Sequence, residues 1–181
     1  RFIRCDFGDL SIVSVYHPSG TSGDERQNFK MKWLNDFQNY VNNLRKEREN
    51  LILCGDYNIC HRPIDIHDPI RNANNSGFLP EEREWMENFL NSGWIDSFRF
   101  MNPDKKDAYS WWSYRFNARA NNKGWKIDYC MVSDKKKTKY GKRMPYIILG
   151  MAATIIAFPF MALCYIWNSL AGLIVTMLVV L

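Results

Sequence analysis

The last 38 residues of the chain, 144–181, contain no Asp, Glu, Lys or Arg, whereas charged residues are frequent before them. An apolar stretch of this kind favours helices that cross a membrane, and residues 145–163 are long enough to span a bilayer. Pro159 does not argue against this, because membrane helices tolerate proline. We therefore expect one complete transmembrane helix and a second, over 170–181, that is cut off by the chain end.

The charged residues divide the chain in the same way. Six of the 24 Lys and Arg residues lie in 135–143, so residues 1–134 hold the other 18 together with all 19 acidic residues. The net charge of +5 thus comes from a basic segment, which we expect to be a cytoplasmic loop before the membrane helices. Residues 1–134 are nearly neutral, so any contact with nucleic acid must depend on local placement of side chains.

The cysteines indicate a compartment. Five of them are scattered along the chain without a CxxC pair. An odd, scattered set is typical of a reducing compartment rather than of a disulfide framework. We therefore expect residues 1–134 to be cytoplasmic.

Residues 1–134 alternate between strand and helix patterns, which predicts an α/β fold in layers. The helix over 24–47 should begin with a capping box of Ser22 and Glu25 and bury Phe29, Phe37 and Val41 on one face. The other expected elements are a hairpin over 2–16, a buried strand over 51–54, a helix over 80–92, and strands over 108–114 and 125–132.

Polar residues follow the buried strand over 51–54 at once, in Gly55-Asp56-Tyr57-Asn58. Residues two apart in an extended chain share a face, so Asp56 and Asn58 should point the same way. A phosphoryl-transfer site needs this pair, because the carboxylate accepts a proton from water and the amide orients the water or a phosphate. The alternative is an Asx turn that only ends the strand.

Two further strand ends carry polar groups. Tyr16 follows an apolar strand, where its hydroxyl suits a phosphate oxygen, although a packed ring with a wet hydroxyl is the alternative. Asp128 lies between Ile127 and Tyr129, and a carboxylate among apolar neighbours needs a partner such as a histidine, a metal or an arginine.

The segment 109–129 interleaves aromatic residues with Arg, Asn and Lys. This composition suits a surface that grips a sugar-phosphate backbone beside an unstacked nucleotide. The alternative is that alternate aromatic side chains of a strand face the core.

Together these segments resemble the exonuclease III family of abasic-site endonucleases, within the larger endonuclease/exonuclease/phosphatase superfamily. The matching stretches cover about residues 1–133: VSVYHPSG (13–20), LILCGDYNICHRPIDI (51–66), NSGFLPEEREWM (75–86), GWIDSFR (93–99), YSWWSYR (109–115) and ARANNKGWKIDY (118–129). The resemblance implies a four-layer α/β sandwich of the DNase I-like type, here incomplete at the N-terminus and the C-terminus.

The resemblance also implies Mg²⁺-dependent cleavage of DNA, 5′ to an abasic site and at 3′ ends, with Mn²⁺ as the alternative metal. Asp56 would activate the attacking water and Asn58 would hold that water or the phosphate, and both are implied metal ligands. Tyr16 would contact the scissile phosphate, and Asp128 would orient a catalytic histidine. Mg²⁺ suits such a site because it prefers oxygen ligands and neutralises charge on the phosphate.

The remaining implied residues contact DNA. Trp125 would help to line the pocket for an extruded abasic sugar. Arg115 and Arg119 would face the DNA, and Ser19 and Asn121 are further expected contacts. The expected partner is double-stranded DNA with abasic sites or 3′ ends, and no obligate protein partner is evident.

The chain departs from this family at both ends. The family's N-terminal half-sheet, with an Asn and a metal-binding Glu, has no counterpart here, and KKKTKYGKRMPYIILG replaces an S-D-H-x-P-type motif from Lys135 onward. The histidines are His17, His61 and His67, and none lies in such a motif. Asp128 therefore lacks its expected partner, and we predict that the chain alone is inactive or nearly so.

The tail has a resemblance of its own. Residues 133–145 resemble the cytoplasmic loop D-x-x-x-T-x-x-G-x-R-x-P of sugar:cation symporters of the major facilitator superfamily, although a basic flank of any membrane anchor is the alternative. The leading hypothesis is a chimera of a partial nuclease domain (1–134), a basic loop (135–143) and membrane helices (144–181). The other hypotheses are a transporter fragment, a membrane-tethered nuclease, and the same fold acting on RNA or a phospholipid.

Overall fold

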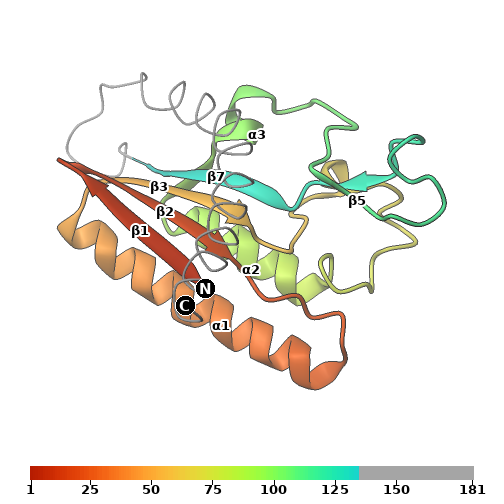
Figure 1. The fold of residues 1–181 in the computed structure, drawn as a ribbon, viewed down its shortest axis with the longest axis horizontal. Coiled ribbons are helices and arrows are strands. Elements are labelled where there is room, and N and C mark those ends of the chain that lie inside the picture. Colours follow the sequence, from red (N-terminus) through yellow and green to blue (C-terminus); the bar gives the residue numbers. More distant parts are fainter. Residues whose placement is uncertain (135–181) are drawn as a thin grey trace, which may run out of the picture. The chain divides into compact units, whose positions relative to one another are not determined.

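The computed structural model describes residues 1–134, which form a five-stranded sheet, helices packed against it and a small two-stranded sheet at one end (Figure 1). The predicted basic loop, 135–143, and the predicted membrane helices, 144–181, lie outside the described residues. Within residues 1–134, no helix is both long and apolar enough to cross a membrane.

The five-stranded sheet is mixed and has the strand order β1-β2-β3-β7-β4. The bounds are Phe2–Phe7 (β1), Leu10–Tyr16 (β2), Asn50–Asp56 (β3), Trp94–Asp96 (β4) and Asp128–Ser133 (β7). β1 and β2 form the predicted antiparallel hairpin, β2 and β3 are parallel, and β7 runs antiparallel to both of its neighbours. The last described strand therefore lies inside the sheet, between β3 and β4.

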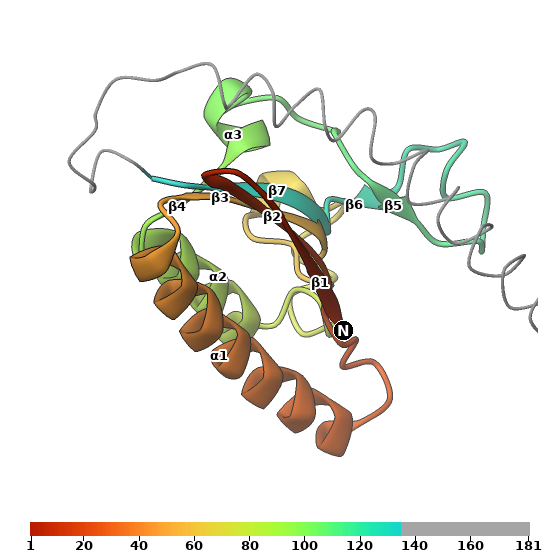
Figure 2. The same ribbon diagram turned by 60° about the vertical axis from the view of Figure 1, so that its left-hand side comes forward.

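Two helices, α1 (Asp24–Glu47) and α2 (Pro80–Asn91), cover one face of this sheet, and both were predicted (Figure 2). Strand side chains that point toward the helices form an apolar core with side chains of both helices. The core includes the buried residues Val13, Leu34, Val41, Leu53, Phe89 and Met131.

The start of α1 corrects two predictions. The N-cap is Gly23, with a φ of 98°, and no side chain caps the helix, because the helix begins one residue later than a Ser22 cap requires. Phe29 is 49% exposed, although Phe37 and Val41 are buried as expected. Lys30 is buried in place of Phe29, which apolar periodicity cannot foresee.

The opposite face of the sheet is less well covered. Ile3 and Phe7 of β1 are 71% and 60% exposed. A short helix, α3 (Ser97–Met101), lies on this side (Figure 2). The α/β class is thus confirmed, but residues 1–134 contain one large sheet and not the two of a four-layer sandwich.

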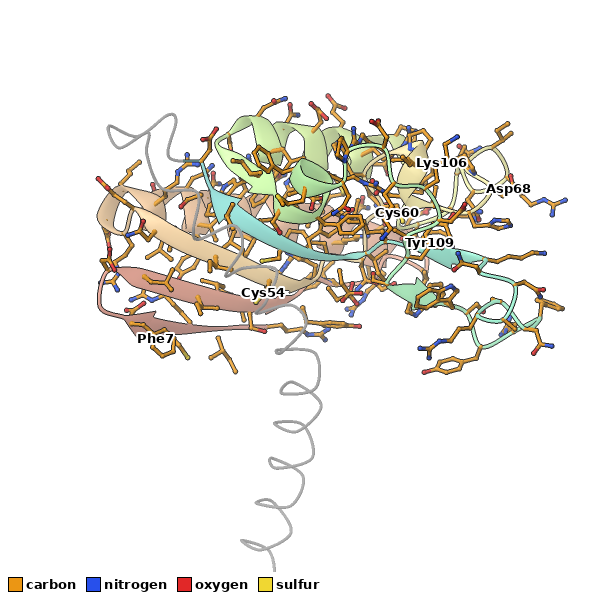
Figure 3. The ribbon with its side chains drawn as sticks, turned by 90° about the horizontal axis from the view of Figure 1, so that it is seen from above. Phe7, Cys54, Cys60, Asp68, Lys106 and Tyr109 are labelled. Atoms are coloured by element: carbon orange, nitrogen blue, oxygen red, sulfur yellow. The ribbon has the colours of Figure 1, made fainter. Side chains whose placement is uncertain are left out.

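The small sheet consists of β5 (Trp111–Trp112) and β6 (Gly124–Trp125), and residues 102–127, which contain it, are called the arm below. Figure 3 shows Tyr109 of the arm at the end of the described part that lies opposite Phe7. The strand predicted over 125–132 is interrupted after Trp125. Lys126 and Ile127 use their backbone groups elsewhere: Lys126 N–H donates to the Asp65 carbonyl at 2.7 Å, and the Ile127 carbonyl accepts from Tyr57 N–H at 2.9 Å.

Three short elements were not predicted, one before α2 and two between α2 and the arm. They are the single-turn helix η1 (Pro63–Asp65), β4 and α3. Asp96 ends β4 and caps α3, because its carboxylate accepts from the N–H groups of Phe98 at 3.0 Å and Arg99 at 3.2 Å.

Candidate active site

Tyr16, Asp56 and Asp128 lie in one row across three adjacent strands. Tyr16 and Asp56 are register partners in the parallel pair β2–β3, and Asp56 and Asp128 are opposite each other in the antiparallel pair β3–β7. Adjacent strands are about 4.8 Å apart and register partners share a face, so the phenol and the two carboxylates occupy neighbouring positions. The structure therefore brings together the three predicted strand ends, and this trio is called the carboxylate row below.

Burial disfavours the ionised form of both acids in the row. Burial raises the pKa of Asp56 to about 6; the hydrogen bond from the Asn58 backbone opposes this rise, and the charge of Asp128 adds to it. Burial also raises the pKa of Asp128, against a hydrogen bond with Ser110 and the charge of Lys126. Two facing carboxylates of this kind favour a proton or a cation beside them.

Asn58 lies in a tight turn after β3. Its backbone N–H donates to Asp56 Oδ1 at 2.7 Å, and its side-chain Nδ2 donates to Asp56 Oδ2 at 3.2 Å and to the His17 carbonyl at 2.9 Å. Its φ of 52° is left-handed, a region in which Asn is tolerated. The Asx-turn interpretation is thus correct locally. This turn, and not alternation along a strand, brings Asn58 beside Asp56.

None of the three histidines forms a hydrogen bond with the Asp128 carboxylate in the described structure. His17 is buried in the core and its Nδ1 accepts from Trp33 Nε1 at 3.1 Å. His61 Nε2 lies 2.8 Å from a Glu87 carboxylate oxygen. The partner that Asp128 was expected to orient is therefore not one of these.

Ser110 connects the arm to the start of β7. Its hydroxyl accepts hydrogen bonds from the N–H groups of Ile127 at 3.1 Å and Asp128 at 3.0 Å, and its own N–H donates to the Trp125 carbonyl at 3.0 Å. Ser110 thus fixes Asp128 relative to the arm, a role that no pattern in the sequence signals.

Two tryptophans face each other across the small sheet. The rings of Trp111 and Trp125 are 6.2 Å apart at 83°. Trp125 is half-buried against a small apolar cluster that includes Phe78 and Ile127, whereas Trp111 is 42% exposed. Trp125 therefore lies between core and surface, and Trp111 forms a second aromatic wall that sequence reasoning did not single out.

The other predicted DNA contacts lie on surface loops. Arg115 and Arg119 are exposed between β5 and β6, and the Arg119 guanidinium lies 5.4 Å from the ring centre of Trp112. Asn121 donates to the Asn117 carbonyl at 3.1 Å, so it also shapes its own loop. Ser19 follows β2, and its hydroxyl lies 3.1 Å from that of Thr21. Their contacts with DNA stay predictions.

The donor atoms suit one hard cation without completing its shell. In residues 1–134 no group of three or more His, Cys, Asp or Glu is arranged to hold a metal ion. Asp56 and Asp128 nevertheless supply two facing carboxylates. The hydrogen bonds of the Asn58 side chain are made by its Nδ2, so its Oδ1 is available as a further oxygen ligand. Mg²⁺ is commonly held by one or two carboxylates, with waters and substrate phosphates as further ligands. The residues present fit such an ion.

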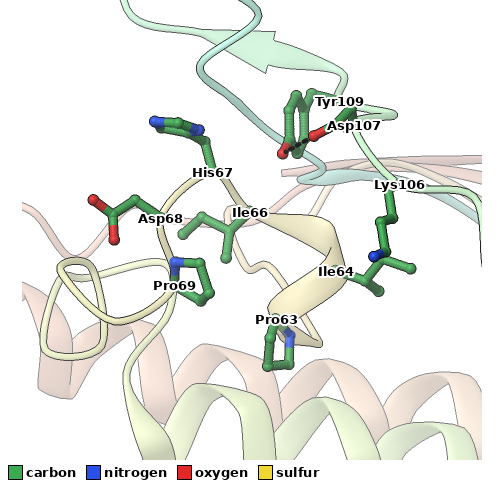
Figure 4. A pocket seen from close by; sticks show the side chains of 9 residues that line it. All are labelled: Pro63, Ile64, Ile66, His67, Asp68, Pro69, Lys106, Asp107 and Tyr109. Carbon is green, nitrogen blue, oxygen red and sulfur yellow. Dashed lines mark hydrogen bonds between the residues drawn. The ribbon is translucent and has the colours of Figure 1, made fainter.

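A surface pocket of about 420 Å³ lies beside the base of the arm (Figure 4). It is lined by Pro63, Ile64, Ile66, His67, Asp68, Pro69, Lys106, Asp107 and Tyr109. Burial raises the pKa of Tyr109 to about 12, and its hydroxyl donates to Asp107 Oδ1 at 3.1 Å. No member of the carboxylate row lines this pocket, so the two features are separate.

Comparison with known proteins relates the sequence of this chain to one protein family. Residues 1–146 match the Endonuclease/Exonuclease/phosphatase family. The match runs beyond residue 134, where the sequence predicted the nuclease part to end, and through the whole predicted basic loop, 135–143. The comparisons give no support to the predicted symporter resemblance of the tail.

The curated relatives are DNA enzymes. An exodeoxyribonuclease of Bacillus subtilis is 43% identical over 137 residues, which cover 76% of this chain and 54% of the relative. The DNA repair nuclease APEX1 of Danio rerio is 41% identical over 133 residues, which cover 74% of this chain and 43% of the relative. The chain therefore spans about half the length of these relatives.

Solved structures share the fold. A 3′–5′ exonuclease from Neisseria meningitidis has a TM-score of 0.70 at 27% identity, over 74% of this chain and 52% of that one. An AP endonuclease from Archaeoglobus fulgidus has a TM-score of 0.67 at 26% identity, over the same shares of both chains. The mixed sheet with its helices is thus similar to that of known nucleases.

Proposed function

The chain belongs to the endonuclease/exonuclease/phosphatase family, and we propose that its carboxylate row serves the hydrolysis of phosphodiester bonds in DNA, at abasic sites and 3′ ends. The observation that carries the proposal is the placement of two partly buried, facing carboxylates next to the exposed phenol of Tyr16. The names of the relatives, an exodeoxyribonuclease and a DNA repair nuclease, support the choice of DNA as substrate.

Asp56 is suited to accept a proton from the attacking water. Without a bound ion, burial raises the pKa of Asp56 to about 6, so its carboxylate is still largely ionised at neutral pH and can accept a proton. Its two hydrogen bonds from Asn58 hold the carboxylate in one orientation. Tyr16, which is 49% exposed, can donate its hydroxyl to a phosphate oxygen.

Asp56, Asp128 and the side-chain oxygen of Asn58 would hold Mg²⁺, or Mn²⁺ in its place. When bound, the ion neutralises negative charge that builds on the phosphate. The bound ion would also keep both carboxylates ionised near neutral pH, because a nearby cation favours the charged form.

The arm supplies the surface for DNA. Arg115 and Arg119 are exposed and would contact phosphates, which position a duplex without reading its sequence. Trp111 and Trp125 offer two aromatic faces at the foot of the arm, where a flipped sugar without a base can lie.

The expected rate is low. General acid–base groups contribute about 10²- to 10⁴-fold, and within residues 1–134 no histidine bonds Asp128. We therefore expect the 181-residue chain to cleave abasic DNA more slowly than the Bacillus subtilis relative by about that factor.

The test compares incision of an abasic-site duplex by the full chain and its Asp56→Asn variant, with and without Mg²⁺. We expect slow, Mg²⁺-dependent nicks 5′ to the site, and a loss of about 100-fold or more in the variant. Asp36→Asn, at an exposed acid of α1, is the matched control and should cleave normally. A cleavage rate that changes neither on removal of Mg²⁺ nor in the Asp56→Asn variant would reject the proposal.

A membrane-bound form is the second candidate, because residues 144–181 lack charged side chains. A chimera with a transporter fragment explains the same observation. Flotation of the expressed chain with lipid vesicles tests membrane binding, and one continuous sequencing read across codons 120–150 tests the join. A chain that stays out of the lipid fraction excludes the first, and a single continuous transcript excludes an artificial join.

A further inference from the structure

Two charged residues form an ion pair inside the protein, beside the turn of Asn58. Lys30 of α1 and Glu82 of α2 are both fully buried, and Lys30 Nζ lies 2.5 Å from Glu82 Oε1. A buried ion pair rarely stabilises a fold more than apolar residues of the same size. The next core positions of α1, Leu34 and Phe37, are apolar, so stability alone gives no reason for a lysine here.

Both partners of this ion pair also bind backbone groups of other segments. The Lys30 ammonium donates to the Asn58 carbonyl at 2.8 Å. The second oxygen of Glu82 accepts from the N–H groups of Gly77 at 2.6 Å and Leu79 at 3.0 Å. The pair thus joins the turn after β3 to the loop before α2.

These two segments contact each other and the ring of Trp125. Cys60 N–H donates to the Gly77 carbonyl at 2.7 Å. Gly77 has a φ of 97°, and a Cβ there would lie 3.0 Å from Trp125 Cζ3 and 3.3 Å from the Asn58 carbonyl oxygen. The ring of Trp125 therefore rests on the backbone of Gly77, directly beside the Asn58 turn.

We propose that Lys30 and Glu82 are positioning residues that hold the Asn58 turn and the backbone under Trp125 at a fixed separation. They thereby align the carboxylate row with the rings of Trp111 and Trp125 for binding of an abasic duplex. This inference rests on the proposed function. A purely structural pair can be exchanged for any uncharged pair that packs equally well. A positioning pair depends on the hydrogen bond to the Asn58 carbonyl.

The double variant Lys30→Met/Glu82→Gln separates these roles. It removes both charges at nearly constant volume, so no buried charge is left unpaired. The Gln oxygen can still accept from the loop before α2, but Met cannot donate to the Asn58 carbonyl. Lys32→Met, at an exposed position of the same helix, is the matched control.

The measurements are thermal melting, amide hydrogen exchange, and affinity for abasic against intact duplex without divalent metal, all on the full chain. We expect the double variant to melt within about 3 °C of the wild type. Exchange at residues 57–60 and 77–79 should rise, and the preference for the abasic duplex should fall, each by about 10-fold or more. Lys32→Met should change none of these.

Several results overturn the proposal. If amide exchange at 57–60 and 77–79 in the double variant equals that of the wild type, the pair does not hold these segments. If exchange in the double variant is faster but its preference for the abasic duplex is unchanged, holding these segments does not serve DNA binding. A double variant that does not fold assigns the pair to stability. If the wild-type chain shows no preference for the abasic duplex, the proposed function is rejected instead. The ratio of exchange rates between the double variant and the wild type then decides alone whether the pair holds the Asn58 turn.

Discussion

The sheet with α1 and α2, and the arm, are held in place by different forces. Apart from the Lys30–Glu82 ion pair, the core under the helices is apolar and aromatic, and Phe89 stacks on Trp85 and Trp94 with ring centres 5.0 and 5.6 Å away. The base of the arm is fixed by buried ion pairs. This difference indicates that the apolar core decides whether the fold forms, whereas the ion pairs decide where the arm lies relative to the carboxylate row.

Two ion pairs fix the base of the arm. Arg99 Nη2 lies 2.7 Å from Asp65 Oδ1, and Arg99 Nη1 also donates to the Lys105 carbonyl at 2.7 Å. Lys126 Nζ lies 2.8 Å from Asp96 Oδ2. Directional contacts of this kind specify a geometry more than they add stability.

The largest expected effect lies in the apolar core. Phe89→Ala should lower the free energy of unfolding by about 4 kcal/mol, because it removes a fully buried ring and leaves a cavity. Chemical denaturation measures this loss, and Phe100→Ala, at a ring that is 49% exposed, is the control. Equal losses for both variants would contradict the view that this core sets the stability.

A smaller and more local effect is expected at the arm. Arg99→Met leaves the buried Asp65 without its ion-pair partner, which should cost about 3 kcal/mol. Hydrogen exchange should rise mainly in residues 102–127 and around η1, and Arg99→Met/Asp65→Asn should restore part of the loss. A uniform rise that includes α1 would show that the arm and the core are not separate.

The smallest effect near neutral pH is a pH dependence that arises from one polar group in the core. Burial lowers the pKa of His17 from 6.5 to about 3, and the charge of Lys30 adds to this. Between these values the unfolded chain binds a proton that the folded chain does not. Stability should therefore fall as the pH drops from about 6.5 toward 3, by at most about 1.4 kcal/mol per pH unit for this residue.

The comparison variant for this prediction is His17→Asn, whose side-chain oxygen can still accept from Trp33 but does not titrate. Denaturation curves at pH 7, 5 and 4 should show a shallower acid loss in the variant than in the wild type. Identical pH profiles would mean that His17 is protonated or solvated in the folded state.

Local patterns were enough to predict the elements with the strongest periodicity. The hairpin, both long helices and the buried strand β3 were expected. Tyr16, Asp56 and Asp128 were expected at strand ends, and in the structure each ends or begins a strand of one sheet. The register that makes Asp56 face Asp128 depends on β7 pairing next to β3, which no local pattern encodes.

The missed residues act through contacts between distant segments. Ser110 matters because it binds the backbone beside Asp128, and Lys30 because Glu82 meets it from another helix. Neither residue type is distinctive where it occurs in the sequence. At Asn58 the Asx-turn alternative was correct, and the expectation from strand alternation was wrong because the residue has a left-handed φ, with hydrogen bonds to Asp56 and from Lys30 to its carbonyl.

The insertion of β7 between β3 and β4 has a consequence for synthesis on the ribosome. The neighbours of this strand emerge long before it does, and until it pairs they present open edges that can bind other chains. Asp56 meets its opposing acid only when Asp128 arrives. A nascent chain therefore has the residues of both long helices and of the hairpin well before its carboxylate row is complete.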